Sequence, residues 1–145
     1  MMIRRLITSL LFTSAVFVAG YWFGSGSTPV HAQTGNRVFE LRTYHTPEGK
    51  LDNLLTRFRD HTIEIFNRHG MTSIGYWIPT DEPLKGKTLI YVLAHPSREA
   101  AKANWAAFRN DPEWKKVAAA SEANGKIVEK VDSVFMEPAD FSAIK

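Results

Sequence analysis

The chain of 145 residues contains no cysteine. Disulfide bonds and lipid attachment at a cleavage-site cysteine are therefore excluded, and the hydrophobic core must stabilise the fold unaided. Zinc sites built from thiolates are excluded too, and no two histidines have the close spacing of a zinc or di-iron motif. We therefore expect neither a metal nor a cofactor.

Other strong signatures are also missing from the sequence. It has no phosphate-binding loop, no nucleophile elbow and no dinucleotide fingerprint, and no internal repeat is evident. The composition is 44% hydrophobic and 23% charged, as is ordinary for one globular domain. The sequence thus excludes several enzyme classes without naming a reaction.

The N-terminal segment differs from the rest of the chain. Arg4 and Arg5 stand without any acid before an apolar run over residues 6–23, and small residues lead to Ala32. This pattern predicts a secretory signal peptide, residues 1–32, with cleavage after Ala32 and export to the periplasm or the exterior. The domain is then residues 33–145.

A retained membrane anchor stays open as the alternative. Residues 6–23 would rise about 27 Å as a helix, which nearly spans a bilayer core. We expect membrane contact only if this segment is retained. The pair Arg4-Arg5 also fits twin-arginine export, but the flanking residues which that pathway favours are missing, so the export route stays open.

Removal of residues 1–32 leaves 113 residues, which is enough for a sizeable core. The net charge falls from +3 to +1, because Arg4 and Arg5 are the only charged residues removed. A nearly neutral domain lacks the basic surface of a nucleic-acid binder, so we expect no nucleic-acid partner.

The apolar periodicity predicts an α+β fold in the ferredoxin-like order β-α-β-β-α-(α)-β. Alternation favours strands over residues 37–44, 71–78, 88–95 and 126–136. Four residues mark helix ends: Thr46, Ser97 and Asp111 as N-caps and Gly70 as the left-handed stop. Pro47 is expected in the first turn of the first helix, which runs to about His69.

The helices of such a fold cover one face of an antiparallel sheet. We expect them to cover Phe39, Leu41 and Thr43, which leaves the face with Glu40, Arg42, Tyr44, Tyr91 and Leu93 open. A large, half-apolar face rarely stays bare in a soluble monomer. The sequence therefore predicts a face-to-face homodimer, which closes an α+β barrel around a cavity between two sheets.

Several stretches resemble the NIPSNAP family. These are FELRTY followed by PEGKLD, then FNRHGM with IGYW, LIYVLAH, WAAFRNDPEWKK and EPADFS, which together span nearly all of residues 37–142. Glu48 in PEGKLD and Ala139 in EPADFS depart from the commoner pattern, and neither departure touches the core motifs. The resemblance implies a dimeric α+β barrel in a bacterial-type secreted member. It implies little about activity, because the wider superfamily includes cofactor-free monooxygenases and isomerases, whereas most NIPSNAP proteins have no assigned reaction.

Two residues of the first helix are candidates for catalysis. His61 lies at the edge of the apolar stripe and Glu64 follows three residues later, so their side chains can meet. An oriented imidazole can act as a base. The alternative is a boundary histidine that pairs within its own helix, and we favour that structural role.

A second group of candidates lies on the strands. Glu40, Arg42, Tyr44 and Tyr91 would line the cavity between the sheets and bind a small ligand. In a filled barrel, Glu40 and Arg42 would instead form a salt bridge at the dimer interface. His95 ends a strand beside a proline, either at a site opening or in an exposed loop.

Two functions stay open. The first is a small-molecule binder with a partly apolar ligand, with a cofactor-free oxygenase or isomerase as the enzymatic form. The second is a non-catalytic interaction or scaffold protein with a filled interior. An open pocket around Glu40, Arg42 and Tyr91 would favour the first, and tight packing there would favour the second.

Overall fold

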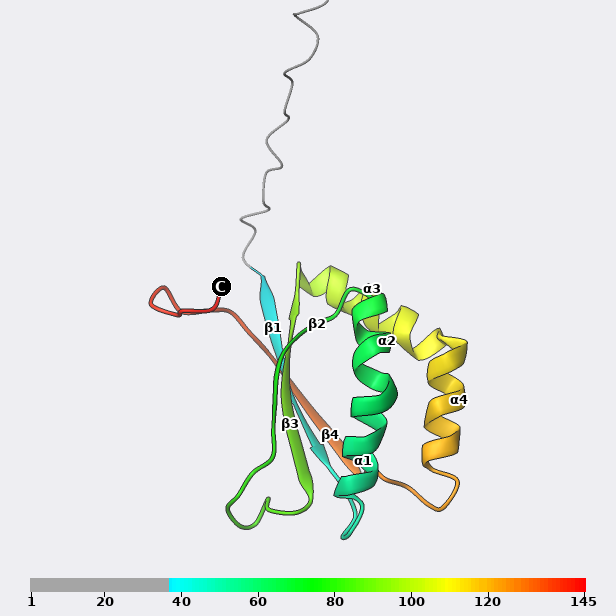
Figure 1. Ribbon diagram of the computed structural model, residues 1–145. Coiled ribbons are helices and arrows are strands. Elements are labelled where there is room, and N and C mark those ends of the chain that lie inside the picture. The colour runs from blue at the N-terminus through cyan, green and yellow to red at the C-terminus, as the bar shows by residue number, and fades with distance from the viewer. Residues whose placement is uncertain (1–36) are drawn as a thin grey trace, which may run out of the picture. The chain divides into compact units, whose positions relative to one another are not determined.

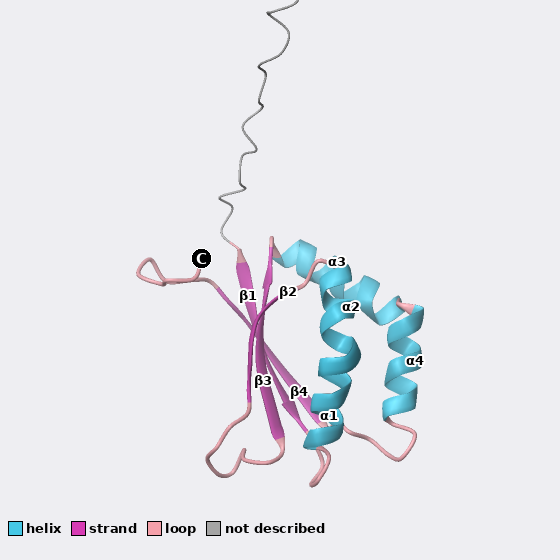
Figure 2. Ribbon diagram, viewed as in Figure 1, coloured by secondary structure: helices cyan, strands magenta, loops and turns pink. Residues whose placement is uncertain are grey.

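The computed structural model describes residues 37–145, which form an antiparallel four-stranded sheet with helices on one face (Figures 1 and 2). The strand order is β2-β3-β1-β4. In chain order, the elements are β1 (Val38–His45), α1 (Leu51–Arg57), the π-helical turn η1 (Phe58–Thr62), α2 (Ile63–Arg68), β2 (Thr72–Trp77), β3 (Thr88–His95), α3 (Arg98–Asn110), α4 (Pro112–Ser121) and β4 (Lys130–Met136). The predicted ferredoxin-like α+β fold is confirmed.

The expected signal peptide or anchor, residues 1–32, lies outside the described residues, so its cleavage stays a prediction. Between residues 37 and 145, no helix combines the length and the apolar character that a membrane crossing requires.

Three of the predicted helix ends are confirmed. The Ser97 hydroxyl accepts a hydrogen bond from the backbone N–H of Ala100, and the Asp111 carboxylate accepts from two backbone N–H groups at the start of α4. These bonds satisfy amide groups that have no partner within a helix. Gly70 has a φ of +71°, the left-handed conformation that ends a helix.

The start of the first helix was predicted wrongly. Helix α1 begins at Leu51, and no side chain caps it. Thr46 instead donates its hydroxyl to the carbonyl oxygen of Lys87, at 3.3 Å, and Pro47 lies in the turn before the helix. Strand β4 is also shorter than expected, because it begins at Lys130 and not at residue 126.

The π-helical turn η1 interrupts the first helix and was not predicted. The Thr62 hydroxyl donates to the carbonyl oxygen of Arg57, at 3.1 Å, across this turn. A π-helical turn holds an extra residue, which shifts the side chains that follow. Arg57, the last residue of α1, and Phe58, the first residue of the turn, are both buried.

The core lies between the sheet and the helices, with Tyr91 of β3 at its centre. Its ring is fully buried and contacts Phe58, Phe66, Tyr76 and Tyr44, with centroids 5.2–6.0 Å apart. Aromatic pairs at these distances stabilise a core beyond the burial of their area.

The prediction of which sheet face is covered was wrong. Arg42 pairs with Tyr91 and Glu40 with Leu93 across β1 and β3, so these residues do share a face. That face lies under the helices, where Glu40, Tyr91 and Leu93 are each at most 2% exposed. The face with Leu41, Thr43, Ile90 and Val92 is open instead. The prediction left the face with Glu40 and Arg42 open to solvent, but in the structure these two charges pair with each other inside the protomer.

Candidate functional site

The carboxylate of Glu40 joins four elements of the fold. Its Oε1 accepts hydrogen bonds from Arg42 Nη1 and Ser133 Oγ, both at 2.6 Å. Its Oε2 accepts from Trp105 Nε1 at 2.6 Å and from His95 Nε2 at 3.2 Å. Strands β1, β3 and β4 and helix α3 thus meet at one buried charge. Neither a ligand-binding role nor a dimer salt bridge is needed to explain Glu40, because its ion pair lies within β1.

The same contacts determine the protonation state of Glu40. Burial by itself raises the pKa of this carboxyl, but hydrogen bonds from His95, Ser133, Trp105 and Arg42 lower the pKa to about 2. His95 is fully buried, whereas the sequence predicted it either at a site opening or in an exposed loop. Its Nε2 must donate the hydrogen bond, because the ionised carboxylate of Glu40 can only accept.

Acid should therefore destabilise the fold in a defined window. The folded pKa of Glu40, about 2, lies below the model-peptide value of 4.5, so its ionisation stabilises the protein fully above pH 4.5. That contribution is lost as the pH falls from 4.5 to 2. Urea unfolding followed by tryptophan fluorescence across this range should show a steeper decline for the wild type than for Glu40→Gln. Equal slopes would contradict this account.

Two tyrosines and two arginines form a second cluster beside the Glu40 network. The Tyr44 and Tyr91 ring centroids are 5.4 Å apart, and the Arg42 guanidinium lies 5.6 Å from the Tyr44 centroid. Both phenols act electrostatically on Arg42 and on Arg57. Burial raises the pKa of Tyr91 well above its usual value, and Tyr44 and Arg42 lie near its hydroxyl without hydrogen-bond geometry, so that the hydroxyl has no hydrogen-bond partner within the described part of the chain.

Arg57 is the second charge of this cluster, and its guanidinium lies 5.2 Å from the Trp114 ring centroid. Its side chain is only 5% exposed. Nη1 donates to Ser121 Oγ at 3.2 Å and lies 3.7 Å from Glu122, whereas Nε is buried and has no hydrogen-bond partner among residues 37–145. Burial is the main cause that lowers its pKa. A buried guanidinium remains charged, so it favours a nearby anion strongly.

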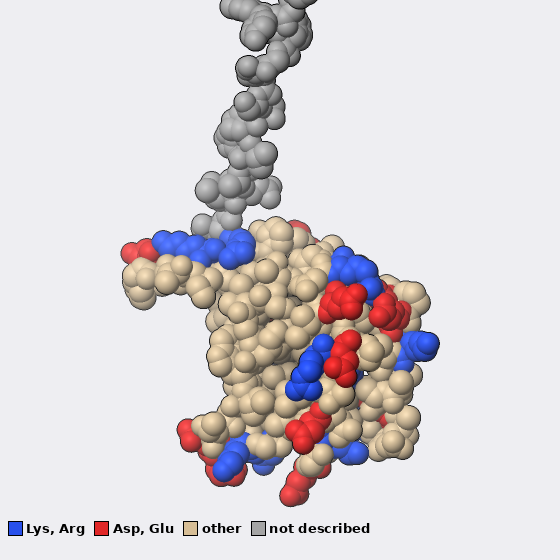
Figure 3. All heavy atoms as spheres, in the orientation of Figure 1, with Lys and Arg blue, Asp and Glu red and all other residues tan. Residues whose placement is uncertain are grey.

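A groove of about 670 Å³ opens beside Arg57, between α1 and α4. This volume is within the usual range for small-molecule sites. Its lining includes Lys50, Arg57, His61, Lys116, Ser121 and Ile127. Figure 3 shows charged side chains of both signs on this helical side of the molecule. The groove thus combines an apolar floor with a buried cation.

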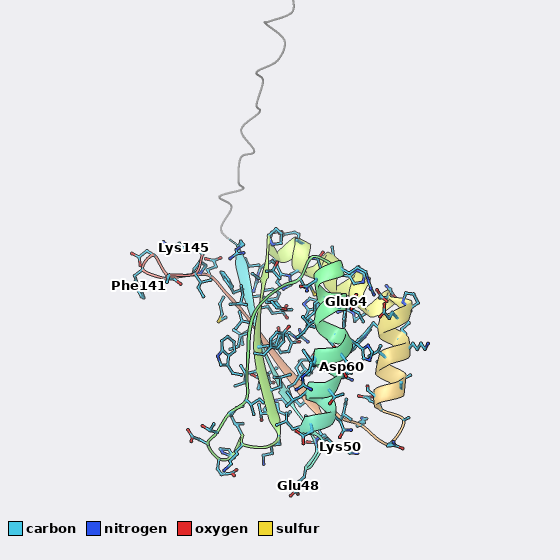
Figure 4. All side chains as sticks on the ribbon, in the orientation of Figure 1. Glu48, Lys50, Asp60, Glu64, Phe141 and Lys145 are labelled. Atoms are coloured by element: carbon cyan, nitrogen blue, oxygen red, sulfur yellow. The ribbon has the colours of Figure 1, made fainter. Side chains whose placement is uncertain are left out.

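The predicted catalytic pair is not brought together. His61 is exposed and lines the groove. Glu64 is exposed on α2 (Figure 4) and is not among the residues that line the groove. No hydrogen bond or ion pair joins the two side chains within residues 37–145, so neither the catalytic pair nor a pairing within the helix is seen. The groove is not lined by Glu40, Arg42 or Tyr91, which were expected to surround the cavity.

Three residues at these sites were not selected from the sequence: Arg57, Trp105 and Ser133. One signal for Arg57 was available, because it follows Leu54 by three residues and therefore falls on the buried side of α1. A charged residue within an apolar stripe indicates a function or a buried partner. Trp105 and Ser133 carried no comparable signal.

A family model described as NIPSNAP matches residues 39–143 of this chain. No curated protein matches the chain in sequence. Among solved structures, a NIPSNAP family protein of unknown function from Agrobacterium tumefaciens is similar, with a TM-score of 0.66 and 22% identity. The match covers 77% of this chain and 96% of that one.

Two further structures are similar. An uncharacterised NIPSNAP-like domain protein from Burkholderia xenovorans has a TM-score of 0.64 and 18% identity, over 74% of this chain and 90% of the other. A monooxygenase from Streptomyces coelicolor, in complex with nanaomycin D, has a TM-score of 0.54 and 18% identity, over 76% and 94% of the two chains. At these identities the likeness concerns the fold.

Proposed function

Because this chain belongs to the NIPSNAP family, whose fold does not determine an activity, we propose a function from its own groove: the protein binds a small, partly apolar anion between α1 and α4. The observation that carries the proposal is Arg57, a buried cation with incomplete compensation beside an open groove. An acidic group of the ligand would pair with Arg57, and its apolar part would lie along Val117, Ala120 and Ile127.

Other features of the groove support this ligand class. Lys50 and Lys116 add positive charge to the groove lining, which also contains the acidic residues Asp52 and Glu113. The Streptomyces coelicolor monooxygenase holds nanaomycin D, so this fold can accommodate a small molecule. An oxygenase or isomerase reaction would require a base beside the ligand, and His61 occupies that position on the groove wall. The competing function, a non-catalytic scaffold, is favoured by the tightly packed interior around Tyr91.

Two matched probes test the proposal by isothermal titration calorimetry at pH 7. 2-Naphthoate and 2-naphthalenemethanol share a ring system and differ in their charge. We expect the naphthoate to bind the purified protein at least tenfold more tightly, because a charged hydrogen bond to Arg57 contributes about 1.5–3 kcal/mol. Equal affinities would overturn the anion preference. No binding of either probe would favour the scaffold function.

We predict a separable role for His61. His61→Ala should weaken naphthoate binding about threefold to tenfold, since one polar contact in a groove contributes about 0.5–1.5 kcal/mol. The free energy of unfolding should change by less than about 0.5 kcal/mol because the side chain is exposed. Glu64→Ala, outside the groove, is the matched control and should leave both quantities unchanged. A loss of stability without a loss of binding would assign His61 a structural role.

We also propose a homodimer, now through the face with Leu41 and Val92. Val134 and Trp77 extend this face and are 56% and 52% exposed. The Trp77 indole lies across Gly75, where a Cβ atom would meet it at 2.6 Å. At one end of this face Asp132 pairs with His45 and Lys130, and a second copy would remove the apolar remainder of the face from water.

Val134→Asp should dissociate this dimer. A charge buried within an apolar interface would raise the dimer dissociation constant by about a hundredfold or more, through a desolvation cost of several kcal/mol. Sedimentation equilibrium measures the constant, and Ala119→Asp on exposed helix α4 is the control. A wild-type protein that remains monomeric at high concentration would overturn the dimer proposal.

We further propose that the chain is exported, with residues 33–145 as the mature protein. The charge pattern of residues 1–32 supports export. The intact mass of the protein purified from its own host tests this directly. A mass that corresponds to residues 33–145 is expected, and a mass that retains residues 6–23 would favour the anchor.

A further inference from the structure

The segment after β4 contains an unusually exposed aromatic residue. We call residues 137–145 the C-terminal arm. Phe141 is 90% exposed and Ile144 is 52% exposed. A phenylalanine offers about 150–250 Å² for burial, so its full exposure on a single protomer leaves a large apolar surface in water. Such a side chain in an ordered position indicates a contact that one protomer does not provide.

The arm has a defined shape. The backbone N–H of Ser142 donates to the Ala139 carbonyl oxygen at 2.9 Å, and Lys145 Nζ donates to the Asp140 carbonyl oxygen at 2.7 Å. Arg37 Nε, just before β1, donates to the Lys145 carbonyl oxygen at 3.1 Å. These bonds close the arm into a hook and tie it to the start of β1. Phe141 is thus presented from a preformed hook.

The position of the arm identifies what covers it. It leaves β4 after Met136, whose partner Phe39 lies in a row with Ala94 and Thr72 across the sheet. Figures 1 and 4 show the arm projecting to the side of the sheet away from the helices, with Phe141 near its tip. A second protomer that covers the open face must therefore meet the arm.

We infer that the arm is a dimerisation element: it packs against the second copy of the chain, with Phe141 buried as its anchor, so that the two arms clasp the two sheets. This inference rests on the proposed face-to-face homodimer. In this dimer the interface consists of the two arms together with the two sheet faces. A buried aromatic anchor is the kind of residue that dominates binding at such interfaces.

Phe141→Asp tests the inference by sedimentation equilibrium of the full chain. We expect the dimer dissociation constant to rise about tenfold to a hundredfold, which corresponds to burial of one large apolar side chain. Unfolding of the protomer should not change, because Phe141 is exposed there. Ala119→Asp introduces the same charge on α4, away from the arm, and should leave the constant unchanged.

A photo-crosslinking experiment supplies a second measurement. p-Benzoylphenylalanine at position 141 should give a covalent dimer upon irradiation, and the same residue at position 119 should not. If Val134→Asp dissociates the dimer while Phe141→Asp does not, and position 141 gives no crosslink, the arm inference fails and the dimer proposal stands. A wild-type monomer at high concentration would overturn both.

Discussion

Replacement of Glu40 by alanine is expected to lower the free energy of unfolding by about 3–5 kcal/mol, the usual cost of removing one partner from a buried ion pair. The carboxylate is 2% exposed and accepts four hydrogen bonds. Its removal leaves the Arg42 guanidinium buried without a counter-charge and leaves the Trp105 indole N–H without an acceptor. Since small domains are stable by only about 5–15 kcal/mol, this loss is a large part of the total.

Chemical denaturation followed by tryptophan fluorescence measures this loss. Glu64→Ala is the matched control, because Glu64 is exposed on α2 and should change stability by less than about 0.5 kcal/mol. Glu40→Gln keeps the shape and one acceptor, so it should lose less than the alanine variant and still fold. A Glu40→Ala loss no larger than that of Glu64→Ala would show that the network contributes little to stability.

The order of elements was predictable because each boundary has a local chemical cause. Ser97 and Asp111 accept backbone hydrogen bonds at helix starts, and Gly70 takes the left-handed conformation at a helix end. Thr46 failed as a cap because its backbone N–H and its hydroxyl both donate to the Lys87 carbonyl oxygen, a long-range partner, and the helix begins only at Leu51. Tertiary contacts of this kind are not visible in a local pattern.

The covered face of the sheet was not predictable from alternation alone. Alternation correctly assigned Glu40, Arg42 and Tyr44 to one face of β1, but it does not state which face meets the helices. Which face the helices cover depends on whether the charged side chains of that face find hydrogen-bond partners inside the protomer. That depends on Trp105, Ser133 and His95, which come from three other elements. Such a network exists only once the chain is folded.

The position of the candidate site depends on a similar effect. His61 was selected for its chemistry and does line the groove, but Arg57 was not selected. Arg57 falls on the buried side of α1 by its spacing from Leu54, but His61 lies in the π-helical turn, which no sequence rule anticipates. The groove also requires α4 to lie beside α1, at a spacing that the sequence does not specify.

Arg57→Gln is expected to weaken 2-naphthoate binding about thirtyfold or more, because loss of a buried charged partner costs about 2–5 kcal/mol in affinity. The neutral probe 2-naphthalenemethanol should bind the variant and the wild type equally. Glutamine keeps a polar group that can bond to Ser121. It removes the guanidinium charge, whose nearest carboxylate, that of Glu122, lies 3.7 Å away. The free energy of unfolding should therefore stay within about 1 kcal/mol or rise.

This combination separates a binding role from a structural one. Arg59→Gln is the matched control: it removes the same charge from an exposed position two residues further along the helix, and it should leave naphthoate affinity within about twofold, as expected for a screened surface charge. Arg57→Lys keeps the charge but not the planar guanidinium, so it should bind with intermediate affinity. If Arg57→Gln lost stability by several kcal/mol while its naphthoate affinity matched that of Arg59→Gln, Arg57 would be a structural residue and the groove would not be an anion site.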